Sequence, residues 1–167
     1  MPTSVGNQTV YLGAGNTIWF RQAGGTFHIA GRAPADTAAV TIDRGRVVYA
    51  AGDRIVVVGG DALTLRLPGR ITALAAHDGR YAVDAAGALY IVSNGTPRNV
   101  GVARDVLIWS PDGKQLAPRL TQGWTPVAWV DNHDLLVTKA NKVGVLPAGG
   151  GSVTHVCTAP SGTTAVR

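Results

Sequence analysis

The sequence predicts an all-β protein, and three observations carry that prediction. Short apolar or β-branched runs of four to seven residues recur along the chain, each bounded by Gly, Asn or Asp. No segment keeps a helical period for more than about eight residues. The chain also has 22 Gly and 9 Pro, and all ten of its acidic residues are Asp. Without Glu and with three Lys, it lacks the residues that usually fill the exposed faces of helices, which argues against a helical bundle and a Rossmann-type α/β protein.

The predicted strands follow one another, and short turn signals lie in many of the gaps between them. In chain order they span residues 9–13, 17–21, 26–30, 39–42, 47–51, 54–58, 62–67, 71–75, 81–84, 89–93, 105–109, 115–120, 126–130, 135–139, 142–146 and 152–157. The turn signals between them are Gly15-Asn16, Arg44-Gly45, Gly52-Asp53, Asp78-Gly79, Asn94-Gly95, Asp112-Gly113 and Asn132-His133. Asp-Gly and Asn-Gly supply the positive φ angles that tight hairpins need, so the sequence predicts an all-β meander.

The strands also repeat as a unit. A pattern of strand, small-residue turn and second apolar strand occurs at 10–19 and recurs at 48–56, 81–90 and 136–145. Its anchor residues Ile18, Ile55 and Leu89 are 37 and 34 positions apart. A four-stranded unit of about 35 residues cannot bury its faces alone and stacks radially into a β-propeller.

We therefore predict a small or partial β-propeller of four to five short antiparallel blades within a single domain, 1–167. The approximate blades are 8–32, 39–69, 71–102, 104–123 and 125–157. The fourth of these, 104–123, is incomplete, since it has room for only two strands. A β-sandwich or barrel is the alternative, because short strands with tight turns fit those folds as well.

One segment carries a more specific resemblance. Residues 106–117, Val-Leu-Ile-Trp-Ser-Pro-Asp-Gly-Lys-Gln-Leu-Ala, resemble the Trp-Ser-Pro-Asp-Gly-Lys-x-Leu-Ala signature of TolB-like β-propeller blades, and 126–137 resembles a degenerate second copy. The similarity is clearest over about 105–137. It implies that Ser110, Pro111, Asp112 and Gly113 form the turn between a blade's first two strands, where Pro presets φ and Gly takes the left-handed position.

Charge and cysteine content narrow the choice of partners. The net charge is +5 and the pI about 9.9, but the twelve Arg are spread from Arg21 to Arg167 without any basic run, so a nucleic-acid partner is not expected. Cys157 is the one cysteine, and its apolar surroundings in the sequence predict a small buried residue.

The N-terminus has neither the basic nor the apolar region of a signal peptide, and no run is long enough to span a bilayer. We expect a chain made in the cytoplasm.

The sequence predicts no enzyme and no cofactor. It has no Gly-x-Ser-x-Gly nucleophile elbow, and its cysteine and histidine spacings match no metal motif. A glycosidase needs two facing carboxylates, and Asp131 with Asp134 is the nearest pair in the sequence. Most Asp residues fall in predicted turns, where backbone capping explains them.

Surface recognition remains as the function class. Trp124 follows the predicted loop 120–123, so we predict a binding surface formed by Trp124, Arg119 and Gln122, suited to a sugar or a partner's pocket. The alternative for Trp124 is a core position between blades, as expected for Trp19, Trp109 and Trp129, which lie within predicted strands.

The function expected from these observations is a non-enzymatic assembly module that contacts protein subunits, the chain itself among them. A phage virion component, in a tail or as a capsid accessory protein, is the specific form of this hypothesis. The excess of Arg over Lys and the abundance of Ala, Gly and Val, typical of a GC-rich genome, fit such a source. A lectin-like carbohydrate-binding module is the alternative.

Overall fold

The computed structural model describes residues 3–5, 7–60, 62–102, 107–117 and 123–159. The chain folds into two compact units, Met1–Asp105 and Val106–Arg167. In the described residues every regular element is a β-strand, apart from the short 3-10 helix η1 at Ala14–Asn16. The all-β prediction is confirmed, and every described sheet is open with two edge strands, so none of them closes into a barrel.

The first unit contains three four-stranded antiparallel sheets, each in simple up-and-down order. The first sheet has β1 (Thr3–Val5), β2 (Gln8–Leu12), β3 (Thr17–Arg21) and β4 (His28–Arg32). The second sheet has β5 (Thr37–Asp43), β6 (Arg46–Ala51), β7 (Arg54–Val57) and β8 (Ala62–Thr64). The third sheet has β9 (Ile71–His77), β10 (Arg80–Ala85), β11 (Ala88–Ser93) and β12 (Thr96–Val102).

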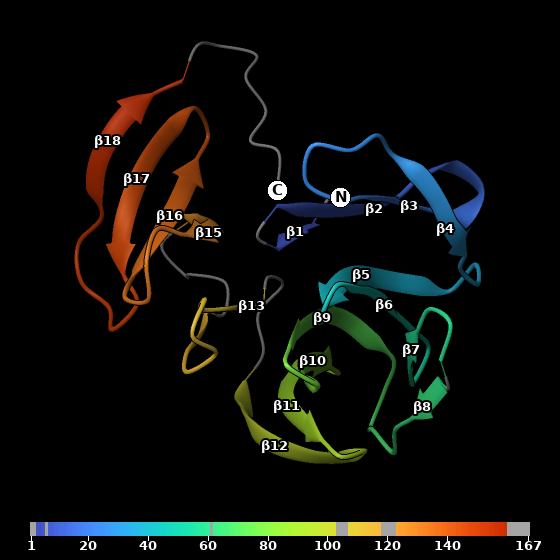
Figure 1. Ribbon diagram of the computed structural model, residues 1–167. Helices are drawn as coiled ribbons and strands as arrows, with labels where there is room; N and C mark the ends of the chain where they lie inside the picture. Colours follow the sequence, from blue (N-terminus) through green and yellow to red (C-terminus); the bar gives the residue numbers. More distant parts are fainter. Residues whose placement is uncertain (1–2, 6, 61, 103–106, 118–122, 160–167) are drawn as a thin grey trace. The chain divides into compact units, whose positions relative to one another are not determined.

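The second sheet is buried on both of its faces, as Figure 1 shows for β5, which lies between the first sheet and β9. Toward the first sheet, one cluster of buried residues joins Val10, Ile18 and Phe20 to Val40, Ile42 and Val47. Toward the third sheet, another joins Val48, Ala50, Ile55 and Leu65 to Ile71, Leu74, Val83 and Val92. This two-sided burial explains why β5 and β6 contain nearly continuous apolar runs instead of a strict alternation.

The hairpins use turns with left-handed backbone. Asp78-Gly79 and Asn94-Gly95 have positive φ at both residues, as these dipeptides predict, and so does Arg44-Gly45, which the sequence also marks as a turn. Ala86-Gly87 does the same with φ angles of 53° and 77°, although an alanine gives no sequence signal for this conformation. The tight turns keep successive strands of one sheet directly adjacent.

The described residues of the second unit form a pair of strands and one complete sheet. The pair is β13 (Ile108–Trp109) with β14 (Leu116–Ala117), where the sequence predicts an incomplete repeat. The complete sheet has β15 (Thr125–Trp129), β16 (Asp134–Lys139), β17 (Lys142–Pro147) and β18 (Thr154–Thr158). Its buried cluster contains Ala117, Leu135, Val137 and Leu146, so β14 packs against the complete sheet.

Some local expectations are wrong. The sequence analysis missed β1 and β12, the second of which contains Pro97 and Gly101, residues that are rare in strand interiors. Cys157 is exposed, because β18 is the last strand of its sheet and all five of its residues are exposed. The alternation around Cys157 therefore marks an edge strand and not a buried one.

We expect the packing between the second and third sheets to dominate the stability of the first unit. Ile55 is only 1% exposed in the cluster that joins these sheets, so Ile55→Ala leaves a cavity and should cost about 2–5 kcal/mol. Urea unfolding measures this loss. Ile29→Ala, which removes the same atoms at a position 59% exposed, is the matched control and should change the free energy of unfolding by less than about 0.5 kcal/mol. Equal losses in the two variants would contradict the placement of the core.

Candidate functional site

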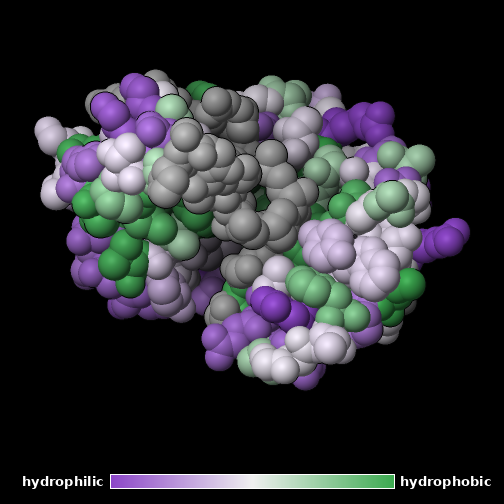
Figure 2. Space-filling view, turned by 90° about the horizontal axis from the view of Figure 1, so that it is seen from above, coloured by the Kyte–Doolittle hydropathy of each residue, from purple (hydrophilic) through white to green (hydrophobic). Residues whose placement is uncertain are grey.

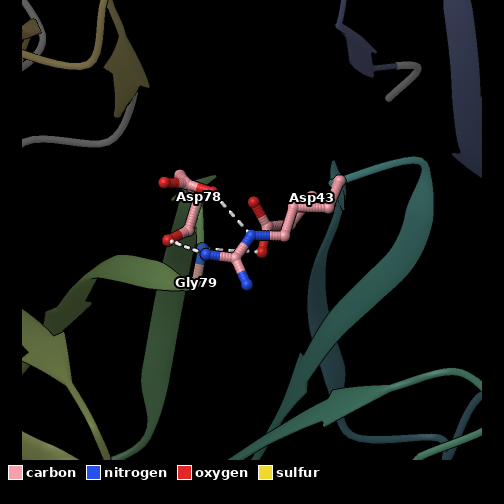
Figure 3. Close-up of polar contacts among 4 residues, drawn as sticks. Asp43, Asp78 and Gly79 are labelled. Carbon is pink, nitrogen blue, oxygen red and sulfur yellow. Dashed lines mark hydrogen bonds and ion pairs between the residues drawn. The ribbon is translucent and has the colours of Figure 1, made fainter.

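The hairpin turns of the second and third sheets are linked by charged side chains. Arg44 lies in the turn between β5 and β6. Its Nε donates to Asp78 Oδ1 at 2.6 Å, and its Nη2 donates to the Asp78 backbone carbonyl oxygen at 2.7 Å. In the opposite direction, the Gly79 backbone N–H donates to Asp43 Oδ2 at 3.0 Å. Figure 3 shows these groups converging from the two neighbouring hairpins. Equivalent turns of adjacent repeats are therefore tied to each other.

The electrostatics of this link are those of a surface ion pair. The hydrogen bond from Arg44 and its positive charge lower the pKa of the Asp78 carboxyl below its ordinary value. Both side chains are mostly exposed, so water and salt screen the pair. These contacts hold the two hairpins together.

The Ser110–Gly113 turn lies between β13 and β14, and its side chains bond to their own loop. The buried Ser110 hydroxyl donates to Asp112 Oδ1 at 2.7 Å and accepts the Gln115 backbone N–H at 3.1 Å. Asp112 Oδ1 also accepts the Lys114 N–H at 3.2 Å, and Gly113 has a φ of 68°. The hydrogen bond from Ser110 lowers the pKa of the Asp112 carboxyl. These contacts form a self-contained turn with Gly113 in the left-handed conformation.

Asp131, half of the carboxylate pair that the sequence offers for glycoside hydrolysis, also caps its own turn. Its Oδ1 accepts the backbone N–H groups of His133 and Asp134 at 2.7 and 2.8 Å. These bonds lower the pKa of the Asp131 carboxyl, whereas a general acid needs a raised one. The Asp131 carboxylate is thus suited to holding the turn and not to donating a proton.

The structure describes only part of the predicted Trp124 surface. Arg119 and Gln122 lie outside the described residues. Trp124 is half-buried and packs against the cluster of Leu135, Val137 and Leu146, with its ring close to Gly144. The binding role of Trp124 stays a prediction. Its packing agrees with the alternative from the sequence analysis, in which Trp124 is a core residue.

The most distinctive exposed surface lies on the first sheet, on the face opposite its buried cluster. Tyr11 and Trp19 pair across β2 and β3 and stack with ring centroids 6.3 Å apart. The Phe27 ring meets Tyr11 edge-on at 5.2 Å, and the Arg21 guanidinium lies 4.9 Å from the Phe27 ring centroid. Ile29, opposite Trp19 on β4, completes what we call the aromatic face: Tyr11, Trp19, Arg21, Phe27 and Ile29.

The aromatic face is accessible. Phe27 is 38% and Ile29 59% exposed, and Arg21 is exposed as well. The right-hand half of Figure 2 looks onto the side of the first sheet away from β5, where pale and green side chains adjoin purple ones. Aromatic rings that border an exposed guanidinium have the composition of an interaction surface.

The sequence analysis assigned Trp19 to the core by default, and the structure places it half-buried on this second face. A signal was present in the alternation. Val10 and Ile18 are fully buried toward the second sheet, so their neighbours Tyr11 and Trp19 must point to the opposite face. Following the period of two through both strands would have paired these two aromatic rings.

Among the described residues, no group of three or more His, Cys, Asp or Glu side chains could hold a metal ion. In that part of the chain, no helix has the length and apolar character required to cross a membrane.

Comparison with known proteins defines the fold class. No protein-family model matches the sequence, and no curated protein matches it. The solved structures that resemble the fold include a chain of the mitotic checkpoint complex, with a TM-score of 0.59 and 13% identity. They also include PorZ, a surface component of the type-IX secretion system of Porphyromonas gingivalis, with a TM-score of 0.57 and 14% identity. The alignments cover 87% and 91% of this chain but only 61% and 26% of those chains. Both neighbours are β-propeller-like, so this chain is an all-β, propeller-like repeat protein.

The stabilisation that the Arg44–Asp78 ion pair gives to the first unit should decrease in acid. Arg44 lowers the pKa of Asp78 in the folded chain. The ion pair therefore stabilises the fold fully above the ordinary carboxyl pKa of 3.8, and this stabilisation disappears as the pH falls through the lowered pKa of Asp78. In Arg44→Gln, the pKa of Asp78 should rise toward 3.8, and this part of the acid dependence should disappear. Carboxyl NMR titration and thermal unfolding at several pH values measure the two effects.

Arg98→Gln removes an exposed arginine of β12 and serves as the control for net charge. It should leave the titration of Asp78 unchanged. An unshifted Asp78 pKa in Arg44→Gln would contradict the pairing.

Proposed function

We propose that the chain is a non-enzymatic, β-propeller-like module that contacts protein partners in a larger assembly. The aromatic face is the observation that carries this proposal. Tyr, Trp and Arg are the side chains most enriched among the residues that dominate binding at protein interfaces, and here they lie together on one rigid sheet. The structural neighbours support a role in assembly, since one belongs to a multiprotein complex and the other to a secretion system.

The rigidity of the aromatic face favours binding. The opposite face of the same strands is locked into the buried cluster with the second sheet, which holds the backbone in place. Two stacked rings and an edge-on third ring restrict one another's rotamers before any partner arrives. A preorganised surface loses little conformational entropy on binding, and this raises affinity for a given contact area.

We expect truncation of the aromatic face to weaken partner binding without unfolding the chain. Phe27→Ala combined with Ile29→Ala removes two exposed apolar side chains, and Arg21→Ala removes the guanidinium; each variant should weaken binding at least about tenfold. Partners are first identified by crosslinking in the source cells. Each is then purified and titrated against the wild-type chain by calorimetry.

Val130→Ala is the matched control, because it truncates an apolar side chain that is 57% exposed in the second unit. It should bind as the wild type does. If the aromatic-face variants retain binding, the aromatic face is refuted. Loss of binding in a Trp124→Ala variant that keeps the wild-type circular dichroism spectrum then assigns the site to the predicted Trp124 surface. Saturable binding that survives all of these substitutions would refute both sites.

A carbohydrate ligand is the second candidate, and the stacked Tyr11 and Trp19 rings are the observation that favours it. Sugars stack their apolar faces on exposed aromatic rings, and the exposed Phe27 and Arg21 border this stack. A glycan array distinguishes the two candidates. Binding that Phe27→Ala removes would favour the lectin, whereas silence on the array would eliminate it.

Two finer proposals concern the family and the setting. The self-contained Ser110–Gly113 turn between β13 and β14 supports a TolB-like repeat. The second finer proposal is that the chain is made in the cytoplasm and joins a phage virion; the excess of Arg over Lys indicates a GC-rich source, which is compatible with such a phage. Copurification of the chain with virus particles on a density gradient tests the second proposal, and a chain that stays at the top of the gradient would refute it.

A further inference from the structure

The last strands of the four-stranded sheets differ in how they protect their free edges. An edge strand exposes unpaired backbone N–H and C=O groups, and proteins block further pairing there with charge, proline, glycine or short length. β8 has three residues, β4 ends in Gly31-Arg32, and β12 contains Pro97, Arg98 and Gly101. β18, Thr-His-Val-Cys-Thr, has five residues and contains no Arg, Lys, Asp, Pro or Gly.

A bulge does not account for the difference. β4, β12 and β18 each carry one extra residue against the neighbouring strand, and in β12 and β18 the extra residues are Val100 and Val156. All five residues of β18 are exposed, with Val156 58% exposed. No described strand pairs with its outer edge, so in the described part of the chain β18 is an open edge strand that carries a bulge, as β4 and β12 do, but lacks their charged residues.

The sequence of β18 is compatible with a second copy of itself. Antiparallel pairing about a two-fold axis at Val156 sets Thr154 opposite Thr158 and His155 opposite Cys157, and each of these pairs occurs twice. Cross-strand Thr–Thr pairs are favourable, and no like charges oppose each other. The same arrangement of β4 or β12 would bring an arginine from each copy to the shared edge. The nearest charge on the strand beside β18 is Lys142, opposite Thr158 at the end of the ladder.

We propose that β18 pairs with β18 of a second copy of this chain, joining two sheets into one across a two-fold axis. This inference extends the proposed assembly function by naming the chain as its own partner. It uses a different surface from the aromatic face. The strand is short, so the contact is weak alone and gains strength where an assembly holds copies close together.

Sedimentation equilibrium over a concentration series up to about 1 mM measures the pairing. The wild type should dimerise, and Val156→Lys should weaken the dimer at least about tenfold, because it places two positive charges against each other at the axis. Val100→Lys is the matched control, since it adds the same charge at the extra residue of β12, and it should leave the dimer unchanged. Circular dichroism establishes that both variants keep the strand content of the wild type.

Chemical crosslinking tests the register. In a Cys157→Ser background, Val156→Cys places one thiol from each copy at the axis, and a short bismaleimide should join them in higher yield than it joins Val100→Cys. A wild type that stays monomeric throughout, or a dimer that Val156→Lys leaves intact, would overturn the inference. The double variant Phe27→Ala with Ile29→Ala separates the two proposals: it should keep the β18 dimer while weakening partner binding, so either proposal can fail alone.

Discussion

The rest of the structure depends on one constraint: a four-stranded sheet whose two faces are both apolar cannot be stable in water without neighbours. The second sheet of the first unit shows this directly. Val40 and Ile42 face the first sheet, whereas Val48 and Ile55 face the third. Neither cluster exists without a neighbouring repeat, so stability is a property of adjacent repeats and not of any single one. The hydrogen bonds between the hairpin turns of the second and third sheets fix how these two sheets are oriented where their apolar faces meet.

The same constraint explains where surfaces for recognition arise. The buried cluster of the first sheet lies between it and the second sheet, and the other face of the first sheet carries aromatic rings instead of a continuous aliphatic layer. Aromatic side chains with a polar atom or a bordering guanidinium tolerate both water and a partner, which a layer of Val and Ile does not. A face of this kind can remain open in the free chain and be covered in a complex.

The sequence predicted those features that depend on local chemistry. Asp78-Gly79 and Asn94-Gly95 form tight turns because their conformational preferences act over two residues, and the strand pattern follows from a period of two. The sequence could not reveal the ion pair between Arg44 and Asp78, since it forms only when two hairpins 34 residues apart come together. The period of two shows which face of β3 carries Trp19, but the sequence could not show whether that face meets a second sheet or solvent.

The sequence analysis missed β12 but predicted β18. The contrast between them shows that the ease of predicting a strand and its tendency to associate have the same cause. Strand propensity measures how well a side chain fits a pleated, paired surface. Pro97, Arg98 and Gly101 lower that propensity in β12, and they are also the residues that prevent a further strand from pairing with its edge. β18 lacks all such residues, so the features that made it easy to recognise in the sequence also make its free edge a good template. A protein that must remain monomeric would be expected to protect this strand as it protects β12. The contrast between two equivalent strands of one chain therefore argues that the exposed edge of β18 is retained for pairing.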